Sequence, residues 1–284
     1  MQDGTPPAPR ILVVGPVAWN HLITLPCLPA PTPHMEMASH ARWTLGGTSA
    51  GKALNLADLG ADVHLITMRG DDEAGRQVSH SLHHPRLTVT WLDSPTTESH
   101  TNLMTPRGER LSIYTATPGE PSPTQVARVV DSLQGADAVV ADLSPVTLAA
   151  LPEIIASGLP VLVDLHDYDG DNSFHRPFRD AATVLTMSNE KLPHPEPFLT
   201  DVVEHGAALA VCTRGASGAV GVSNDGIHET PAAGALVVDT NGAGDAFASA
   251  LFLAWLDGAT PGTAMEAGAA QAGRVVASAT LLPS

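Results

Sequence analysis

The residues of this chain best suited to chemistry are three small residues followed by a carboxylate: Gly242, Ala243, Gly244 and Asp245. An apolar run at 235–238 leads into them, and an Ala- and Leu-rich run at 246–256, which predicts a helix, leads out. The start of a helix has unpaired backbone N–H groups and partial positive charge, so this turn predicts a phosphate site. Because a carboxylate repels phosphate, we interpret Asp245 as a base that takes a proton from an attacking hydroxyl. The combination is typical of phosphoryl transfer to an alcohol.

Composition limits the classes of partner. The chain has 284 residues, with 14 basic and 30 acidic side chains and a formal net charge of −16, which argues against a nucleic-acid or anionic-membrane surface. Backbone N–H groups can still hold the phosphates of a nucleotide. Cys27 and Cys212 form neither a disulfide framework nor a zinc pattern. No signal peptide or membrane-spanning run is recognisable, so we expect a cytoplasmic protein.

Short apolar runs without alternation predict the buried strands of a parallel sheet, at 11–14, 138–141, 161–163, 182–185 and 209–212. Helical patterns lie between them, for example at 124–133 and 147–156. This alternation predicts one α/β domain over 1–284, a doubly wound, mainly parallel sheet with helices on both faces. Two segments, 35–45 and 97–117, are instead richer in polar residues at alternate positions, and the second contains a predicted hairpin turn at 106–109. They belong to two inserts in the α/β pattern, at about 16–45 and 95–117.

The segment from Asp239 to Asp245 reads D-T-N-G-A-G-D, and it resembles the C-terminal signature D-T-x-G-A-G-D of the ribokinase-like (PfkB) carbohydrate and nucleoside kinase family. Gly46 and Gly47 open a predicted helix that ends in Leu-Gly-Ala, which resembles the N-terminal signature of that family. The resemblance covers nearly the whole chain. It implies that the two polar inserts form a small β-sheet lid over the substrate. In several members this sheet also pairs with a second subunit, so a homodimer through the lid is expected.

The resemblance implies an ATP- and Mg²⁺-dependent kinase of a small sugar. Asp245 would be the catalytic base, and the N–H groups of Gly242, Ala243 and Gly244 would form the anion hole. Asp239 matches a residue that contributes to a monovalent-cation site in some relatives. Motifs similar to N-x-x-E and T-x-G-x-x-G imply four nucleotide-binding residues: Asn189, Thr213, Gly215 and Gly218.

Several positions depart from the family pattern. The implied substrate contacts, besides Asp245, are Asn20, Gly46, Gly47, Thr48 and Gly51. Asn20 stands where sugar kinases usually carry Asp, and Gly51 where they carry Asn, so the usual ribose and fructose assignments do not transfer. Leu192 replaces the Glu of N-x-x-E, which leaves Glu190 and Asp164 as candidate magnesium ligands. The run from Gly46 to Lys52 nearly spells a Walker A loop, but Ala53 replaces the hydroxyl that such a loop needs.

Two alternative functions stay open. A nucleoside kinase of the same fold would share the signature, but it would need aromatic stacking, for which Trp19 and Trp43 are the candidates. A binding or regulatory relative without turnover is the other alternative; the intact Asp245 argues against it. His100, in the second insert, is either a further substrate contact or a surface histidine.

Overall fold

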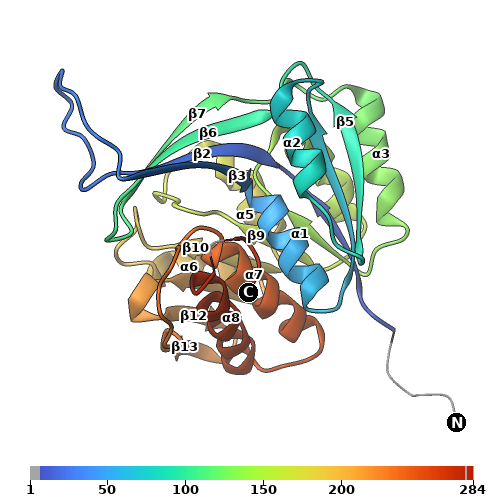
Figure 1. Ribbon diagram of the computed structural model, residues 1–284. Coiled ribbons are helices and arrows are strands. Elements are labelled where there is room, and N and C mark those ends of the chain that lie inside the picture. Colours follow the sequence, from blue (N-terminus) through green and yellow to red (C-terminus); the bar gives the residue numbers. More distant parts are fainter. Residues whose placement is uncertain (1–6, 279, 284) are drawn as a thin grey trace, which may run out of the picture.

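A nine-stranded sheet forms the centre of the computed structural model, which describes residues 7–278 and 280–283 (Figure 1). Within these residues the strand order is β13-β12-β11-β10-β9-β8-β1-β4-β5, and all neighbours from β11 to β5 are parallel. The β12–β13 hairpin continues the sheet antiparallel to β11. The strands are β1 (Arg10–Val14), β4 (Asp62–Arg69), β5 (Leu87–Asp93), β8 (Ala138–Ala141), β9 (Val161–Asp164), β10 (Val184–Ser188), β11 (Leu209–Thr213), β12 (Ala219–Ser223) and β13 (Gly226–Thr230).

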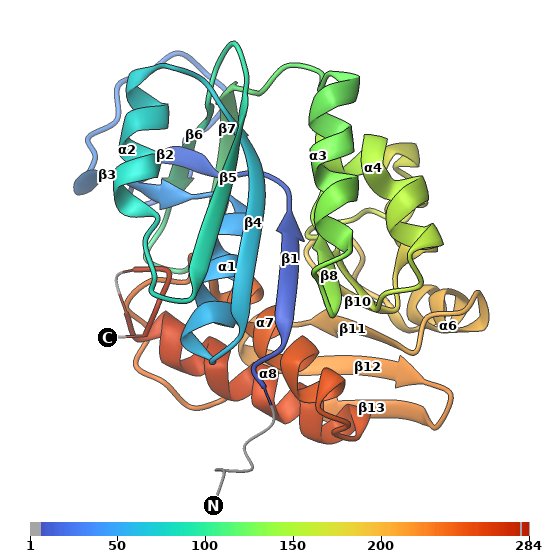
Figure 2. The same ribbon diagram turned by 90° about the vertical axis from the view of Figure 1, so that its right-hand side faces the viewer.

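Helices cover both faces of this sheet, because alternate residues of its buried strands are apolar on either side. In β1, Leu12 and Val14 belong to one core cluster, whereas Ile11 and Val13 belong to the other. The first cluster packs under α3 (Pro123–Leu133), α4 (Pro145–Ala156), α5 (Arg176–Ala181) and α6 (Glu196–Glu204). The second packs under α1 (Thr48–Asp58), α2 (Glu73–Ser81), α7 (Ala243–Leu256) and α8 (Pro261–Val276). Figure 2 shows α3 and α4 on the side of β1 away from α1 and α7. The predicted fold class is confirmed.

A second sheet, which we name the lid sheet, has the order β3-β2-β6-β7. Its strands are β2 (Ala18–Thr24), β3 (His40–Gly46), β6 (Glu98–Met104) and β7 (Arg110–Ala116). They come from the two inserts expected at about 16–45 and 95–117, and Figure 1 shows the sheet lying over α1. Along β2 and β6, every second residue from Ala18 to Leu22 and from Glu98 to Asn102 is buried. The lid sheet therefore has an inner face and an outer face.

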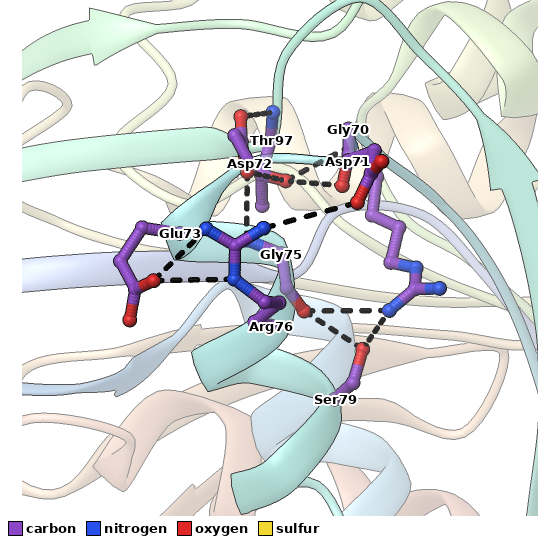
Figure 3. A network of polar contacts seen from close by, with 9 residues as sticks. Gly70, Asp71, Asp72, Glu73, Gly75, Arg76, Ser79 and Thr97 are labelled. Atoms are coloured by element: carbon purple, nitrogen blue, oxygen red, sulfur yellow. Dashed lines mark hydrogen bonds and ion pairs between the residues drawn. The ribbon is translucent and has the colours of Figure 1, made fainter.

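Hydrogen bonds connect the start of the second lid segment to the large sheet (Figure 3). Asp72 caps α2 by accepting from the Gly75 N–H (2.7 Å), and it also accepts from the Thr97 N–H (2.8 Å) and hydroxyl (2.7 Å). The Gly70 N–H donates in turn to the Thr97 hydroxyl (2.9 Å). Burial opposes ionisation of Asp72, but these hydrogen bonds outweigh it and lower the pKa of the carboxyl. The aspartate thus joins the end of β4, the start of α2 and the start of β6.

The apolar run at 235–238 does not pair into either sheet. Leu236, Val237 and Val238 are exposed, and the Val238 N–H donates to the Val276 C=O at the end of α8 (2.7 Å). The sheet edge beyond β11 is already taken by the β12–β13 hairpin, so this segment reaches α7 as a loop. No helix in the described residues is long and apolar enough to cross a bilayer.

Candidate active site

Three carboxylates meet around one buried lysine at the carboxyl end of the large sheet. Asp142 follows β8, Asp164 ends β9, and Asp245 lies in the first turn of α7. The ammonium of Lys52, on α1, lies 3.1 Å from Asp142 Oδ1, 3.1 Å from Asp164 Oδ2 and 2.6 Å from Asp245 Oδ1. The carboxyl ends of parallel strands are where ligands bind in open α/β sheets. We name these four residues the Lys52 cluster.

Sequence reasoning missed Lys52, because we considered it only as the end of a failed Walker A pattern. Its side chain is 0 % exposed, so it needs partners to stay charged. The signal was present in the chain: Lys52 is one of only two lysines and lies in an apolar stretch of a predicted helix. Asp142 and Asp164 each follow a predicted strand directly, and such positions share one edge of a parallel sheet.

The cluster gives its carboxylates different affinities for protons. Burial raises the pKa of Asp245 to about 6; Lys52 opposes this rise, and the charges of Asp164 and Asp142 add to it. The pKa of Asp164 is instead lowered to about 2, because His166 and Lys52 outweigh the effect of burial. The pKa of Lys52 is raised well above its usual value, since the attraction of three carboxylates outweighs burial. Asp245 is therefore ionised at neutral pH and has a pKa suited to a general base.

The start of α7 presents free backbone donors beside Asp245. Gly242 precedes the helix at φ 79°, a conformation that favours glycine, and no side chain caps the helix. The Ala246 N–H donates to the Gly242 C=O (2.9 Å) and the Ala243 N–H makes a long contact with the Thr240 C=O (3.4 Å). The N–H groups of Gly242, Gly244 and Asp245 have no backbone partner among the described residues. The free donors therefore include Gly242 and Gly244 from the predicted anion hole, with Asp245 in place of Ala243.

The glycines carried over as substrate contacts are required by close packing. A Cβ on Gly47, where φ is 88°, would lie 2.6 Å from Val17 Cα. One on Gly46 would lie 2.1 Å from Asn20 Nδ2, and one on Gly51 would lie 2.5 Å from Asp245 Oδ2. Gly46 thus leaves room for Asn20 in the lid sheet, and Gly51 for Asp245. The neighbouring Thr48 hydroxyl is buried and has no partner among the described residues.

The inner face of the lid sheet carries polar groups that the described residues leave unsatisfied. Asn20 on β2 lies opposite His100 on β6, and Asn102 lies two residues further along β6 on the same face. The Oδ1 atoms of Asn20 and Asn102 are buried and have no hydrogen-bond partner among the described residues. Glu98 Oε1 lies 3.0 Å from His100 Nε2, and the Tyr114 ring lies 3.9 Å from the His100 ring. Buried polar groups are normally satisfied, so this face is suited to a hydroxylated ligand.

His100 is therefore buried on this inner face rather than on the protein surface. Glu98 and Asn102 are inner-face residues that sequence reasoning did not find. The alternation of polar residues along the second insert was the available signal, but the sequence did not show which phase faces inward.

The predicted nucleotide residues lie at the ends of neighbouring strands. The Asn189 N–H, just after β10, donates to the Thr213 C=O at the end of β11 (3.1 Å). Gly215 and Gly218 both have positive φ, and a Cβ on Gly218 would lie 2.0 Å from the Thr230 C=O. These two glycines form the tight turn that starts the β12–β13 hairpin. Leu192, in place of the family Glu, packs against the core under α3 to α6.

The candidate cation ligands differ in whether other groups of the protein already bind them. Asp164 is held by Lys52 and by the His166 N–H (3.0 Å), so it does not fit a magnesium role. Asp239 pairs with the Arg42 guanidinium of the lid strand β3. Glu190 is exposed and forms no ion pair among the described residues, so it fits a role beside Asn189. The described residues contain no group of three or more ligands placed for a metal, but Mg²⁺ in such sites is held largely by phosphates and water.

A family model supports the interpretation of this geometry. The model of the pfkB family of carbohydrate kinases matches residues 11–281. The chain belongs to this family. The family, together with the relatives described next, makes the chain a phosphotransferase with a hydroxyl acceptor.

Known relatives and structures agree with this membership. The chain is 27 % identical to the acarbose 7(IV)-phosphotransferase of an Actinoplanes species, over 91 % of this chain and 89 % of that protein. The structure of the microbiome-derived acarbose kinase Mak1 matches with a TM-score of 0.82 and 26 % identity, over 96 % and 94 % of the two chains. Arabidopsis thaliana ribokinase, complexed with ribose and ATP, matches with a TM-score of 0.75 at 18 % identity, over 97 % and 96 %, which shows the shared fold.

Proposed function

We propose that this pfkB-family member transfers the γ-phosphoryl group of ATP to a hydroxyl of a sugar or sugar-like molecule, with Asp245 as the base. One observation carries the proposal. Asp245 Oδ1 is bound by Lys52, whereas Oδ2 has no hydrogen-bond partner among the described residues, and Asp245 itself lies in the first turn of α7, where the N–H groups are unpaired. A base and an anion hole on the same helical turn can serve the attacking and the transferred group at once.

In the proposed reaction, Asp245 Oδ2 accepts the proton of the acceptor hydroxyl. The acceptor oxygen forms a bond to the γ-phosphorus, and the bond from that phosphorus to the β–γ bridging oxygen breaks. Its electron pair stays on ADP, and the proton later leaves Asp245 for solvent. The N–H groups of Gly242, Gly244 and Asp245 stabilise the charge on the transferring oxygens, in keeping with a reaction that depends on positioning and electrostatics.

ATP is the donor that the family implies, and the open helix start fits its phosphates. A Cβ on Gly244 would meet no atom within 4 Å, so the space in front of this turn is open. Asn189 and Glu190 would hold Mg²⁺ at the phosphates, and the bound ion would neutralise part of their negative charge. Arg42 already balances the charge of Asp239 from the lid sheet, so we propose that a monovalent cation is not required there. We place the reaction in the cytoplasm, where ATP is supplied.

The inner face of the lid sheet supports a sugar over a nucleoside. It offers amide, carboxylate and imidazole groups, which suit hydroxyls, from Asn20, Glu98, His100 and Asn102. Trp19 alternates with Asn20 along β2, and Trp43 stacks on His21 with ring centroids 4.4 Å apart, so both tryptophans belong to the outer face. Neither is placed to stack on a base at the inner face. Two relatives named for acarbose support a glycoside as the acceptor.

The outer face of the lid sheet supports the proposed homodimer. Trp43 is 56 % exposed, Leu111 46 % and Ile113 45 %, and all three lie on this face. We propose that a second copy of the chain covers this exposed apolar face. The lid sheet also has two edge strands, β3 and β7, next to it. Light scattering coupled to size exclusion should give a dimer for the wild type and a monomer for Trp43→Glu. A monomeric wild type at micromolar concentration would contradict this proposal.

The assay for the main proposal is ADP release from MgATP across a panel of acceptors. The panel should contain monosaccharides, aminosugars, oligosaccharides including acarbose, and purine and pyrimidine nucleosides. We expect acceptor-dependent ADP release with at least one saccharide and a phosphorylated product of matching mass. Turnover of nucleosides alone would support the nucleoside-kinase alternative. ATP and saccharide binding without any turnover would support a binding or regulatory protein.

A further inference from the structure

We infer that Gly51 and Lys52 together position the base: Gly51 lets the Asp245 carboxylate approach helix α1, and Lys52 holds one of its two oxygens. The inference rests on the proposed function, because it assigns roles around the base of that reaction. Both are positioning residues that act through Asp245. Gly51 stands where the family resemblance implies an Asn, and Lys52 follows it, so the role belongs to this chain's own residues.

Lys52 is completely buried, which is rare for a lysine side chain. Its side chain is 0 % exposed, and burying an ammonium is costly unless charged partners surround it. Three carboxylates lie within 3.1 Å of the ammonium nitrogen; the contact with Asp142 Oδ1 is an ion pair without hydrogen-bond geometry. The shortest contact, at 2.6 Å, goes to Asp245. This contact also has the geometry of a hydrogen bond, so the lysine donates directly to the proposed base.

The other two carboxylates are anchored from elsewhere, so they fix the ammonium in space. Asp142 accepts from the Ser49 hydroxyl (2.7 Å). Asp164 accepts from the His166 N–H (3.0 Å), and its second oxygen lies 3.3 Å from His166 Nδ1. His166 itself has φ 54°, a conformation that a non-glycine residue rarely adopts. Asp142 and Asp164 thus hold Lys52, and Lys52 holds Asp245.

The two oxygens of Asp245 have separate roles in this arrangement. Oδ1 is bound by Lys52, and Oδ2 faces Gly51 with no hydrogen-bond partner among the described residues. A Cβ on residue 51 would lie 2.5 Å from Oδ2 and 2.9 Å from both Cβ and Cγ of Asp245. Such distances cannot be accommodated without moving the carboxylate. Glycine inside a helix normally costs about 0.5–1 kcal/mol relative to alanine, and here it leaves the accepting oxygen in place.

The charges around Asp245 also set the pH range in which its carboxylate can accept a proton. The charged groups that face it are Lys52 from α1, Asp142 after β8, and Asp164 with His166 at the end of β9. Removing the positive charge of Lys52 must raise the pKa of Asp245. Removing the negative charge of Asp142 must lower it. A lysine that served folding alone would not give shifts of opposite sign in the kinetics.

The test compares the acid limb of kcat/KM for the acceptor, at saturating MgATP, in the wild type, Lys52→Met and Asp142→Asn. ATP titrates in the same way in every assay, so differences between variants report on the protein. We expect Lys52→Met to move the midpoint up by about 1–3 pH units, the usual effect of one adjacent opposite charge, and to lower kcat at neutral pH. Asp142→Asn should move the midpoint down.

Gly51→Ala tests the steric part with the charges intact, and it keeps the experiment informative if Lys52→Met does not fold. We expect kcat to fall by up to about 10²-fold, the loss that a small misplacement of a catalytic group can cause. The KM for ATP should change little. Gly262→Ala is the matched control, because a Cβ on this helical glycine would meet no atom within 4 Å. It should keep wild-type kinetics.

Three results would overturn the inference while leaving the proposed function standing. They are an unmoved acid limb in both charge variants, shifts of the same sign in both, or wild-type kcat in Gly51→Ala. Failure of the proposed function looks different, because the wild type itself would then release no ADP with any acceptor of the panel.

Discussion

We predict that two buried amides of the lid sheet lower the stability of the ligand-free protein and help to bind the acceptor. The Oδ1 atoms of Asn20 and Asn102 have no partner in the described structure, and both residues are 4 % exposed. An unsatisfied buried acceptor costs about 1–3 kcal/mol, whereas an apolar residue of similar shape carries no such cost. Asn20→Leu and Asn102→Leu should therefore leave the free energy of unfolding of the ligand-free protein unchanged or raise it by up to that amount. The same amides should bind the acceptor, so its recognition should weaken.

The size of the functional loss follows from the hydrogen bonds removed. A neutral hydrogen bond contributes about 0.5–1.5 kcal/mol net, which corresponds to about a two- to tenfold change in affinity. Each variant should raise the KM for the acceptor by about this factor and leave the KM for ATP unchanged. Thermal or denaturant unfolding without ligand gives the stability, and initial rates at varied acceptor concentration give the KM.

Asn55→Leu is the matched control for this experiment. Asn55 is also fully buried, but it donates to the Gly51 C=O and the Leu281 C=O and accepts from Gln271. Its replacement leaves several buried partners without a hydrogen bond and should lower the free energy of unfolding by about 2 kcal/mol or more. If Asn20→Leu and Asn102→Leu destabilise the protein as strongly as Asn55→Leu and leave the acceptor KM unaltered, the inner face does not bind the acceptor.

Three further predictions concern pH, motion and the nucleotide. With a pKa of about 6 for Asp245, kcat/KM should fall as the pH drops through 6, since about 90 % of the base is ionised at pH 7 and about 10 % at pH 5; a flat profile from pH 5 to 8 would contradict its role. Hydrogen exchange in 35–45 and 97–117 should slow when a turned-over acceptor binds, because closure of the lid sheet would exclude water; unchanged exchange would argue against a moving lid. GTP should replace ATP with less than about a 100-fold loss in kcat/KM, near 2.7 kcal/mol. The reason is that the side chain of Gln271 is buried and donates to Asn55, so it is not available to hydrogen-bond a nucleotide base. A stronger preference for ATP in the same assay would reveal a specific contact with the base.

The sequence predicted the parts of this protein that depend on local pattern. Buried strands such as β1 and β11 are short apolar runs, and helices such as α3 and α4 have caps and periodicity close to the segments expected from the sequence. The turn from Gly242 to Asp245 likewise combines a glycine at positive φ with the first turn of a helix. In these places local conformational preference and burial agree.

The parts that sequence did not predict depend on contacts between distant residues. Lys52 and Asp245 are 193 positions apart, and no local pattern indicated that they touch. The inner face of the lid sheet depends on the parallel register of β2 and β6, which sets Asn20 opposite His100. The run at 235–238 has the composition of a strand, but the β12–β13 hairpin occupies the sheet edge next to β11.

The central claim is that Asp245 is the base of a phosphoryl transfer, and Asp245→Asn tests it most directly. The amide keeps the shape of the side chain and can still accept from Lys52, but it cannot take the proton. The measurement is kcat for ADP release with the best acceptor, with ATP binding followed in parallel and Asp257→Asn, at the exposed far end of α7, as control. We predict a fall in kcat of about 10²- to 10⁴-fold with ATP affinity unchanged or slightly higher, and wild-type rates for Asp257→Asn. A folded Asp245→Asn enzyme that keeps more than about a tenth of the wild-type kcat would contradict the claim, because so small a loss does not fit the removal of a general base.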